Sequence, residues 1–435
     1  MRVLIVNTSE RAGGAAVAAG RLLDALNNNG VKAKMLVRDK DHSRDDDPNS
    51  MGRPQVVEVS RGSAWLRRRH FLWERLCIFI RLHFSREHLF DIDIANSGFD
   101  ITRLPEFKEA DVVHLHWVNQ GMLSLGGIQK ILRSGKPVVW TMHDAWPATA
   151  ICHLTLGCRH FTAGCHHCKY LPGGGDENDL ARRVWLRKQQ LLAQGSISFV
   201  ACSRWLEGEA KGSALLKGQV VTSIPNCIDT RIYNPGSKAE ARQAEGLPAE
   251  GQLLVFACQR VTNVNKGMGY LNEACWQLAQ QRPELTETLT VAVLGSHADE
   301  VAGQMPFRTV PMGYVSDEHR MANIYRAADV FVLPSLSENL PNTIMEAMAC
   351  GVPCVGFRVG GIPEMIDHRR NGYVAQLRDS ADLARGVEWV LCEADRQQLE
   401  REAVRKVQQN YSQASVALRY IEVYQQALAQ KHFKL

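Results

Sequence analysis

Two carboxylates, Glu338 and Glu346, lie eight positions apart in the segment ENLPNTIMEAMACG, which starts at Glu338. The apolar run at 330–333 predicts a strand before them, and a helix is expected over 341–350. Glu338 thus falls beyond the carboxyl end of a strand, where ligands of open α/β sheets bind. Pro341 suits a first helical turn, whose free N–H groups can point at a phosphate. Glu346 can accept hydrogen bonds from a vicinal diol such as ribose.

Arg260 and Lys266 bring positive charge to a second strand–loop–helix junction, just before Gly267. A guanidinium and an ammonium placed there can neutralise a diphosphate as a leaving group gains charge. Loop arginines and lysines are commonly just solvated, and either glutamate alone is explained by an ordinary helix or surface position. The four residues together favour a ligand that carries a diphosphate and a ribose.

The order of apolar runs indicates two α/β domains. Short apolar runs alternate with helical stretches in both halves, which is typical of doubly wound parallel sheets. We expect a first domain over 1–222, a second over 223–411 with a hinge near 223–226, and a helix within 412–435 that is a candidate to pack back on the first domain. The strand-like runs are 3–6, 34–37, 111–117, 137–140, 197–200, 253–256, 289–294, 330–333 and 353–357, and helical stretches are expected over 15–29, 267–281, 317–328, 341–350 and 379–393.

These motifs together resemble glycosyltransferase family 4. The segment that starts at Glu338 is similar to the family's E-x7-E signature, and VPCVGFRVGGIPE at 352–364 continues it. The resemblance runs along nearly the whole chain in the right order, although Cys227 stands where the family linker has glycine. It implies a GT-B fold: two Rossmann-like doubly wound domains with a donor cleft between them and the donor mainly on the second. The other matching features are Arg260, Lys266, SIPNCID at 223–229 and the Gly13-Gly14 loop.

The resemblance implies a role for each site residue. Arg260 and Lys266 would bind the diphosphate, Glu346 the ribose and Glu338 the transferred sugar. The implied catalytic residues are Glu338, His143, Lys266 and Arg260, and the implied donor-binding residues are Gly13, Gly14, Arg260, Lys266, Asn339, Leu340, Pro341 and Glu346.

In the first half, Gly13 and Gly14 would form a loop that approaches the phosphates, because glycine backbone can come close without a Cβ. A plain strand–helix turn explains them equally well on their own. His143 follows the run 137–140 and resembles the family's histidine near the transferred sugar. His114 and His116 share one strand face by alternation, and we interpret them as packing or acceptor-side residues.

The implied reaction is retaining transfer of a hexosyl group from a nucleoside-diphosphate sugar to a saccharide or lipid-linked oligosaccharide. It would proceed by front-face substitution without a catalytic metal, and the cysteine-rich subset of the family suggests bacterial polysaccharide synthesis, such as that of colanic acid. The sequence lacks a complete G-x-G-x-x-G, which disfavours a nicotinamide cofactor. Two alternatives stay open: a GT-B hydrolase or epimerase acting on nucleotide sugars, and a non-catalytic protein that binds them.

Four cysteines, Cys152, Cys158, Cys165 and Cys168, fall in a short insert at 152–168 and end in C-x-x-C. Four thiolates that end in C-x-x-C can serve as structural zinc ligands, although the first interval is longer than in standard zinc ribbons and knuckles. A redox-sensitive bridge and four buried free thiols are the alternatives.

Composition and charge set the wider limits. The chain has 435 residues, 45% of them hydrophobic and 22% charged, with a net charge of +5, which is ordinary for a globular protein and disfavours general nucleic-acid binding. Met1 leads into a strand-like run without a signal segment, so we expect a cytoplasmic protein. Residues 39–55 are expected to form a mobile loop. The stretch 61–84 mixes tryptophan, leucine and arginine, and is either a packed helix with an arginine face or a helix lying on the inner face of the cytoplasmic membrane.

Overall fold

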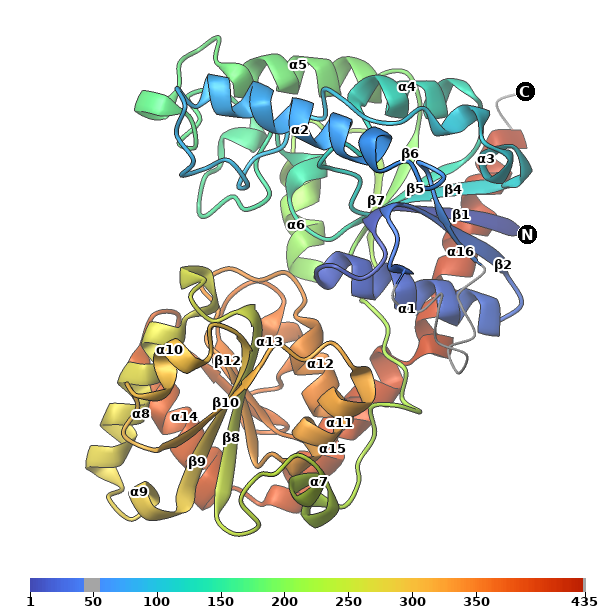
Figure 1. Ribbon diagram of the computed structural model, residues 1–435. Helices are drawn as coiled ribbons and strands as arrows, with labels where there is room; N and C mark the ends of the chain where they lie inside the picture. Colours follow the sequence, from blue (N-terminus) through green and yellow to red (C-terminus); the bar gives the residue numbers. More distant parts are fainter. Residues whose placement is uncertain (43–54, 433–435) are drawn as a thin grey trace. The chain divides into compact units, whose positions relative to one another are not determined.

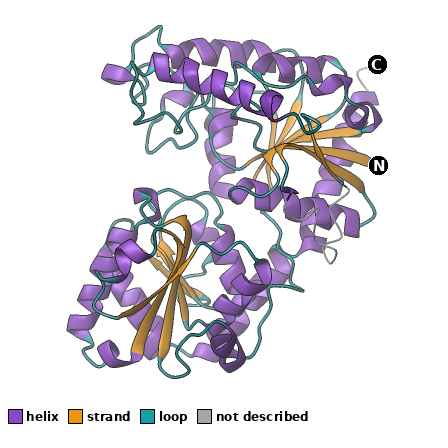
Figure 2. Cartoon of the chain, in the orientation of Figure 1, coloured by secondary structure: helices purple, strands orange, loops and turns teal. Residues whose placement is uncertain are grey.

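The computed structural model describes residues 1–42 and 55–432, so most of the loop predicted over 39–55 lies outside the described residues. The chain divides into two compact units, Met1–Pro225 together with Val416–Leu435, and Asn226–Ser415. Each unit is built around one parallel sheet with helices on its faces (Figures 1 and 2). This is the predicted fold class, two doubly wound α/β domains, and it is confirmed.

The N-terminal sheet has seven parallel strands in the order β3-β2-β1-β4-β5-β6-β7. Every residue of β4 and β5 is buried, which explains why these strands are apolar in the sequence except for His114 and Thr141. The strands are β1 (Arg2–Ser9), β2 (Lys32–Asp39), β3 (Val56–Glu58), β4 (Val112–Leu115), β5 (Val138–Met142), β6 (Ile197–Ala201) and β7 (Val220–Ser223).

Local sequence fixes where several helices of this unit begin. The side chains of Ser63, Ser124, Asp179 and Ser203 each accept a hydrogen bond from a backbone N–H of the first helical turn, and so cap α2, α4, α5 and α6. The helices are α1 (Gly14–Asn28), α2 (Ala64–Arg81), α3 (Pro105–Glu109), α4 (Leu125–Arg133), α5 (Leu180–Leu192), α6 (Arg204–Gly212) and α16 (Gln413–His432).

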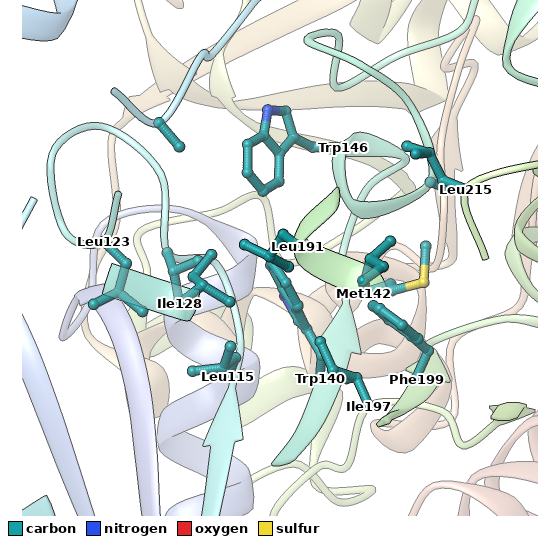
Figure 3. Close-up of a cluster of buried hydrophobic side chains, with 14 of the residues drawn as sticks. Leu115, Leu123, Ile128, Trp140, Met142, Trp146, Leu191, Ile197, Phe199 and Leu215 are labelled. Carbon is teal, nitrogen blue, oxygen red and sulfur yellow. The ribbon is translucent and has the colours of Figure 1, made fainter. Parts of the chain in front are cut away.

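The core of the N-terminal unit is a large cluster of buried side chains, part of which is drawn in Figure 3. Trp140 and Phe199, from the neighbouring strands β5 and β6, stack with ring centroids 5.8 Å apart. The last helix, α16, joins this unit through Tyr424, whose hydroxyl lies 2.7 Å from Nδ1 of His114 on β4. Tyr420 on the same helix lies 2.9 Å from the Thr141 hydroxyl on β5. Helix α16 is therefore an integral part of the N-terminal unit.

The C-terminal sheet has six parallel strands in the order β10-β9-β8-β11-β12-β13. The chain runs from β8 outward to β10 and then returns to β11 on the other side of β8, so the point where the strand order reverses lies between β8 and β11. The strands are β8 (Gln252–Arg260), β9 (Leu289–Ser296), β10 (Arg308–Gly313), β11 (Val330–Leu333), β12 (Cys354–Phe357) and β13 (Gly372–Ala375), and the helices are α7 (Lys238–Ala244), α8 (Met268–Gln281), α9 (Leu285–Thr288), α10 (Asp299–Ala302), α11 (Glu318–Ala327), α12 (Asn342–Ala349), α13 (Ile362–Met365), α14 (Ser380–Glu388) and α15 (Arg396–Asn410).

Candidate donor site

Lys266 and Glu338 meet at the switch point of the C-terminal sheet. Lys266 follows β8 and Glu338 follows β11, which are neighbouring strands, and Lys266 Nζ lies 2.7 Å from Glu338 Oε2. Both side chains are partly accessible to solvent. Burial favours the neutral amine, but the Glu338 carboxylate outweighs it and raises the pKa of Lys266 above its usual value. A charged ammonium thus stands where parallel α/β sheets bind ligands.

The loop that carries Glu338 is held by the turn that carries Lys266. Asn265 Nδ2 donates to the Ser337 carbonyl at 2.8 Å, and Leu336 N donates to the Asn265 carbonyl at 2.8 Å. On its other side, Gly361 N donates to the Asn339 carbonyl at 2.8 Å. The position of Glu338 is therefore set by hydrogen bonds to the backbone of its loop from two other loops.

Two glycines allow these loops to approach so closely. Gly267 (φ 75°) and Gly360 (φ 55°) both have the left-handed backbone conformation that glycine favours. A Cβ on Gly267 would overlap with the Pro334 carbonyl oxygen, and one on Gly360 would overlap with the Glu338 carbonyl oxygen. Both residues are thus part of the framework of the site.

Glu346 lies in the second turn of α12 and is buried, with 7% of its surface exposed. The Tyr325 hydroxyl of α11 donates to Glu346 Oε2 at 3.1 Å. Pro341 is the residue before the helix rather than part of its first turn, which corrects the sequence expectation by one position, and it offers no side-chain cap. The first N–H groups of α12 have no partner within the helix, which is the arrangement that suits an anion.

Arg260 ends β8, and its Nε donates to Thr262 Oγ1 at 2.8 Å. Its side chain is exposed, and among the described residues no carboxylate pairs with it. Of the other predicted donor residues, Leu340 is buried, while the Asn339 carbonyl accepts the bond from Gly361 described above. The structure brings Lys266 into contact with Glu338 and places Arg260 at the same edge of the sheet, while Glu346 lies further along α12.

In the N-terminal unit, Gly13 lies between β1 and α1, and Gly14 is the first residue of α1. Both lie beside a switch point, since β1 is flanked by β2 and β4. Gly13 precedes the helix with φ 90°, and a Cβ there would meet no atom within 4 Å. The glycine is required by the backbone conformation, and the space in front of it is open within this unit.

His143 follows β5 and forms a hydrogen bond with a second histidine, with 2.9 Å between its Nε2 and His116 Nδ1. Its Nδ1 lies 3.5 Å from the Cys202 thiol. Burial lowers the pKa of His143 to about 4, against the opposing effect of Asp144, so the ring is neutral at pH 7. Two neutral imidazoles suit this contact because one ring nitrogen donates and the other accepts.

Asp144 belongs to a buried ionic network that the sequence did not reveal. His153 bridges two carboxylates, with Nδ1 2.7 Å from Asp144 Oδ2 and Nε2 2.6 Å from Asp93 Oδ2. Burial opposes the charge on His153, but the two aspartates outweigh it and raise its pKa to about 10. Trp117 Nε1 also donates to Asp144 at 2.8 Å. The loop after His143 is thus fixed by charge pairs that connect segments far apart in the sequence. The sequence alone showed only that Asp144 follows His143, and gave no sign of the network around it.

The four predicted zinc ligands, Cys152, Cys158, Cys165 and Cys168, line one small cavity of about 20 Å³. All four are free thiols. Within the described ranges, no group of three or more His, Cys, Asp or Glu side chains is arranged to hold a metal ion. The insert therefore gathers the thiols around one cavity but does not place them as a ligand set.

Two doubly wound parallel domains, with cationic residues at a switch point of the second, define a protein of the GT-B class. The sequence profile described as Glycosyltransferase Family 4 matches residues 12–232, and the profile described as Glycosyl transferases group 1 matches residues 251–393. Because the first match covers more than half of the 435 residues, the chain belongs to Glycosyltransferase Family 4.

Curated relatives match part of the chain. D-inositol 3-phosphate glycosyltransferase 2 of Catenulispora acidiphila is 34% identical over 186 residues, which are 40% of this chain and 43% of the relative. D-inositol 3-phosphate glycosyltransferase of Pseudarthrobacter chlorophenolicus is 30% identical over 289 residues, 63% of this chain and 60% of the relative. The chain spans about half the length of the curated relatives it matches.

Solved structures share the fold over the whole length. Sucrose-phosphate synthase of Thermosynechococcus elongatus has a TM-score of 0.66 and 19% identity, with 99% of this chain and 100% of the other covered. HepE of Anabaena, in complex with UDP and glucose, has a TM-score of 0.61 and 15% identity, with 98% of this chain and 100% of the other covered. At these identities the likeness establishes the fold.

Proposed function

We propose that this chain is a retaining glycosyltransferase that moves a hexosyl group from a nucleoside-diphosphate sugar to a saccharide or lipid-linked oligosaccharide, in bacterial polysaccharide synthesis. The observation that carries the proposal is the contact between Lys266 and Glu338 at the switch point between β8 and β11. Membership of Glycosyltransferase Family 4 supports sugar transfer. The HepE structures, which hold UDP and UDP-glucose, support a nucleotide-sugar donor.

The diphosphate would be held without a metal by the Lys266 ammonium, the Arg260 guanidinium and the N–H groups that begin α12. These groups are fixed before the donor arrives, so they stabilise the charge that develops on the leaving group without reorganising. The Lys266 ammonium would then donate hydrogen bonds to both Glu338 and a phosphate oxygen. Arg260, which has no carboxylate partner among the described residues, is available for two parallel hydrogen bonds to phosphate.

In the proposed reaction, the bond from the anomeric carbon to the phosphate oxygen breaks as a bond to the acceptor oxygen forms on the same face. The acceptor's proton passes to the departing phosphate oxygen, and a nucleoside diphosphate leaves. Glu338 would position the sugar hydroxyls instead of attacking the anomeric carbon, because its carboxylate is engaged by Lys266. His143, which the sequence predicts near the transferred sugar, is neutral at pH 7 and so would not act there as a cation.

The ribose would bind Glu346, whose orientation is set by Tyr325. We expect Glu346→Ala to weaken nucleotide binding about 10–100-fold, since a hydrogen bond to a charged group contributes about 1.5–3 kcal/mol. A panel of nucleotide sugars, screened by the rise in melting temperature and followed by calorimetry, measures this. Tyr325→Phe is the control, because it removes the hydrogen bond between Tyr325 and Glu346 but keeps the carboxylate. Nucleotide binding should therefore weaken less in this variant than in Glu346→Ala.

The same panel tests the proposal itself. At least one nucleoside-diphosphate sugar should raise the melting temperature of the wild-type chain, and the Glu346→Ala variant should lose most of that rise. Stabilisation by none of them would contradict the donor site. Release of nucleotide at the turnover rate without any acceptor would instead favour a hydrolase, and donor binding without any turnover would favour a non-catalytic binding protein.

The zinc predicted at Cys152, Cys158, Cys165 and Cys168 stays a proposal, supported by the single cavity that the four thiols line. Elemental analysis of the purified chain should find about one zinc per chain, as a four-cysteine site requires. Cys165→Ser should lose it, whereas Cys275→Ser, at a buried thiol of the other unit, should keep it. A metal-free, fully folded wild-type chain would rule the site out.

A further inference from the structure

Helix α2 turns two charged residues, Glu74 and Arg75, into the protein. Glu74 is fully buried, and its Oε1 accepts backbone N–H bonds from Ile94 at 3.0 Å and Ala95 at 2.6 Å. Arg75 is buried beside it, donating to the Leu89 carbonyl at 2.6 Å and pairing with Asp93. The inward face of α2 therefore docks on the N-terminal unit through charge and hydrogen bonds, with Ile78 as its buried apolar residue.

The outward face of α2 is apolar. Trp65, Leu72 and Trp73 are 68%, 58% and 56% exposed, and Leu76 and Ile80 are each 48% exposed. Most of these residues follow one another at steps of three or four, so they form one stripe along the helix. In Figure 1, α2 lies on the outside of the N-terminal unit. A stripe of two tryptophans and three aliphatic side chains is larger than the scattered apolar residues normal on a protein surface.

The exposed charged residues between 61 and 86 all have one sign. Between 61 and 86 the sequence has seven arginines and one acidic residue, Glu74, which is buried. Arg68, Arg69 and Arg81 are exposed, and none of them has a carboxylate partner among the described residues. The Arg69 guanidinium lies over the ring of Trp65, 5.1 Å from its centroid. Exposed apolar and cationic side chains thus share one face.

We propose that the exposed face of α2 lies on the surface of an anionic phospholipid bilayer. Tryptophan and leucine would enter the boundary between headgroups and acyl chains, while the arginines keep their charge at the anionic headgroups. No helix in the described part of the chain combines the length and apolar character needed to cross a membrane, so α2 would lie in the interface. A symmetric dimer through this face would bring like charges together, which disfavours a second copy as the occupant.

Co-sedimentation of the full chain with phospholipid vesicles tests this contact independently of sugar transfer. The wild type should bind vesicles of phosphatidylcholine mixed with phosphatidylglycerol, and bind vesicles of phosphatidylcholine alone much more weakly. Arg68→Gln with Arg69→Gln should weaken binding roughly 25-fold, about fivefold for each arginine near an anionic surface. Leu72→Gln with Leu76→Gln should weaken it roughly tenfold or more through lost apolar contact.

Matched variants on the same unit serve as controls. Leu418→Gln removes an equally exposed leucine of α16, 57% exposed, and Arg103→Gln removes an exposed arginine, and both should bind vesicles as the wild type does. Thermal unfolding should show all variants folded. The proposal is overturned if the wild type does not bind anionic vesicles, if the controls lose as much binding as the α2 variants, or if sedimentation velocity shows a dimer that the α2 substitutions abolish.

Discussion

Replacing Lys266 with alanine is expected to lower kcat/KM for sugar transfer about 10²–10³-fold, the usual effect of removing one fixed charge-stabilising group. Two effects combine. The variant loses the ammonium that would neutralise the leaving diphosphate, and it leaves the Glu338 carboxylate without its partner at 2.7 Å, facing the phosphates with an unbalanced negative charge. Steady-state kinetics with the donor that best stabilises the chain measures the loss.

Lys406→Ala is a matched control, because Lys406 on α15 pairs with Asp367 at 2.6 Å in the same unit, and neither residue follows β8 or β11. Its kinetics should stay close to wild type. Lys266→Ala with Glu338→Gln should recover part of the donor affinity lost in the single variant, since the unpaired carboxylate is gone. Wild-type kinetics for Lys266→Ala would contradict the assignment of the diphosphate site.

Gly267→Ala is expected to damage both stability and activity. The left-handed backbone conformation alone costs a non-glycine residue about 1–3 kcal/mol of folding free energy. The added methyl group would also overlap with the Pro334 carbonyl oxygen, at the start of the loop that carries Glu338. Relief of that overlap would shift this loop relative to Lys266, so kcat/KM should fall along with the melting temperature.

Gly269→Ala is the control two residues further along α8, where a Cβ would meet no atom within 4 Å. Alanine there should be neutral or slightly stabilising, because glycine within a helix costs about 0.5–1 kcal/mol relative to alanine. Denaturant unfolding and kinetics on both variants separate the two positions. Equal behaviour of the two variants would show that the close approach at Gly267 does not matter.

The fold was predictable to the extent that burial leaves a pattern in the sequence. The run at 330–333 is β11 residue for residue, because a central parallel strand is covered on both faces and must be apolar throughout. Strand β10, at the sheet edge, is half exposed and mixed in composition, so it was not predicted. Helix α15 was missed because only Leu399, Ala403 and Val407 are buried on it. These three residues are spaced four apart, which is the spacing of one helix face and was the only sign of a helix there.

The sequence predicts residues for the candidate site but not the contacts between them. Lys266 and Glu338 were both identified, yet their direct pairing depends on β8 and β11 being neighbours, which is a property of strand order. Tyr325, the partner of Glu346, belongs to no recognisable motif. Its hydrogen bond to Glu346 depends on the packing of α11 beside α12, which the sequence does not indicate. For 61–84 the sequence did not indicate which residues face the protein, whereas burial shows that the charged residues Glu74 and Arg75 turn inward. Contact of the outward face with a membrane stays a prediction.

The most direct measurement of sugar transfer is NMR analysis of the product formed from the stabilising nucleotide sugar and a lipid-linked saccharide acceptor. The account predicts one glycosylated product with the same anomeric configuration as the donor, formed in step with one nucleoside diphosphate and only when acceptor is present. A product of inverted configuration, or free sugar in place of a glycosylated acceptor, would contradict it.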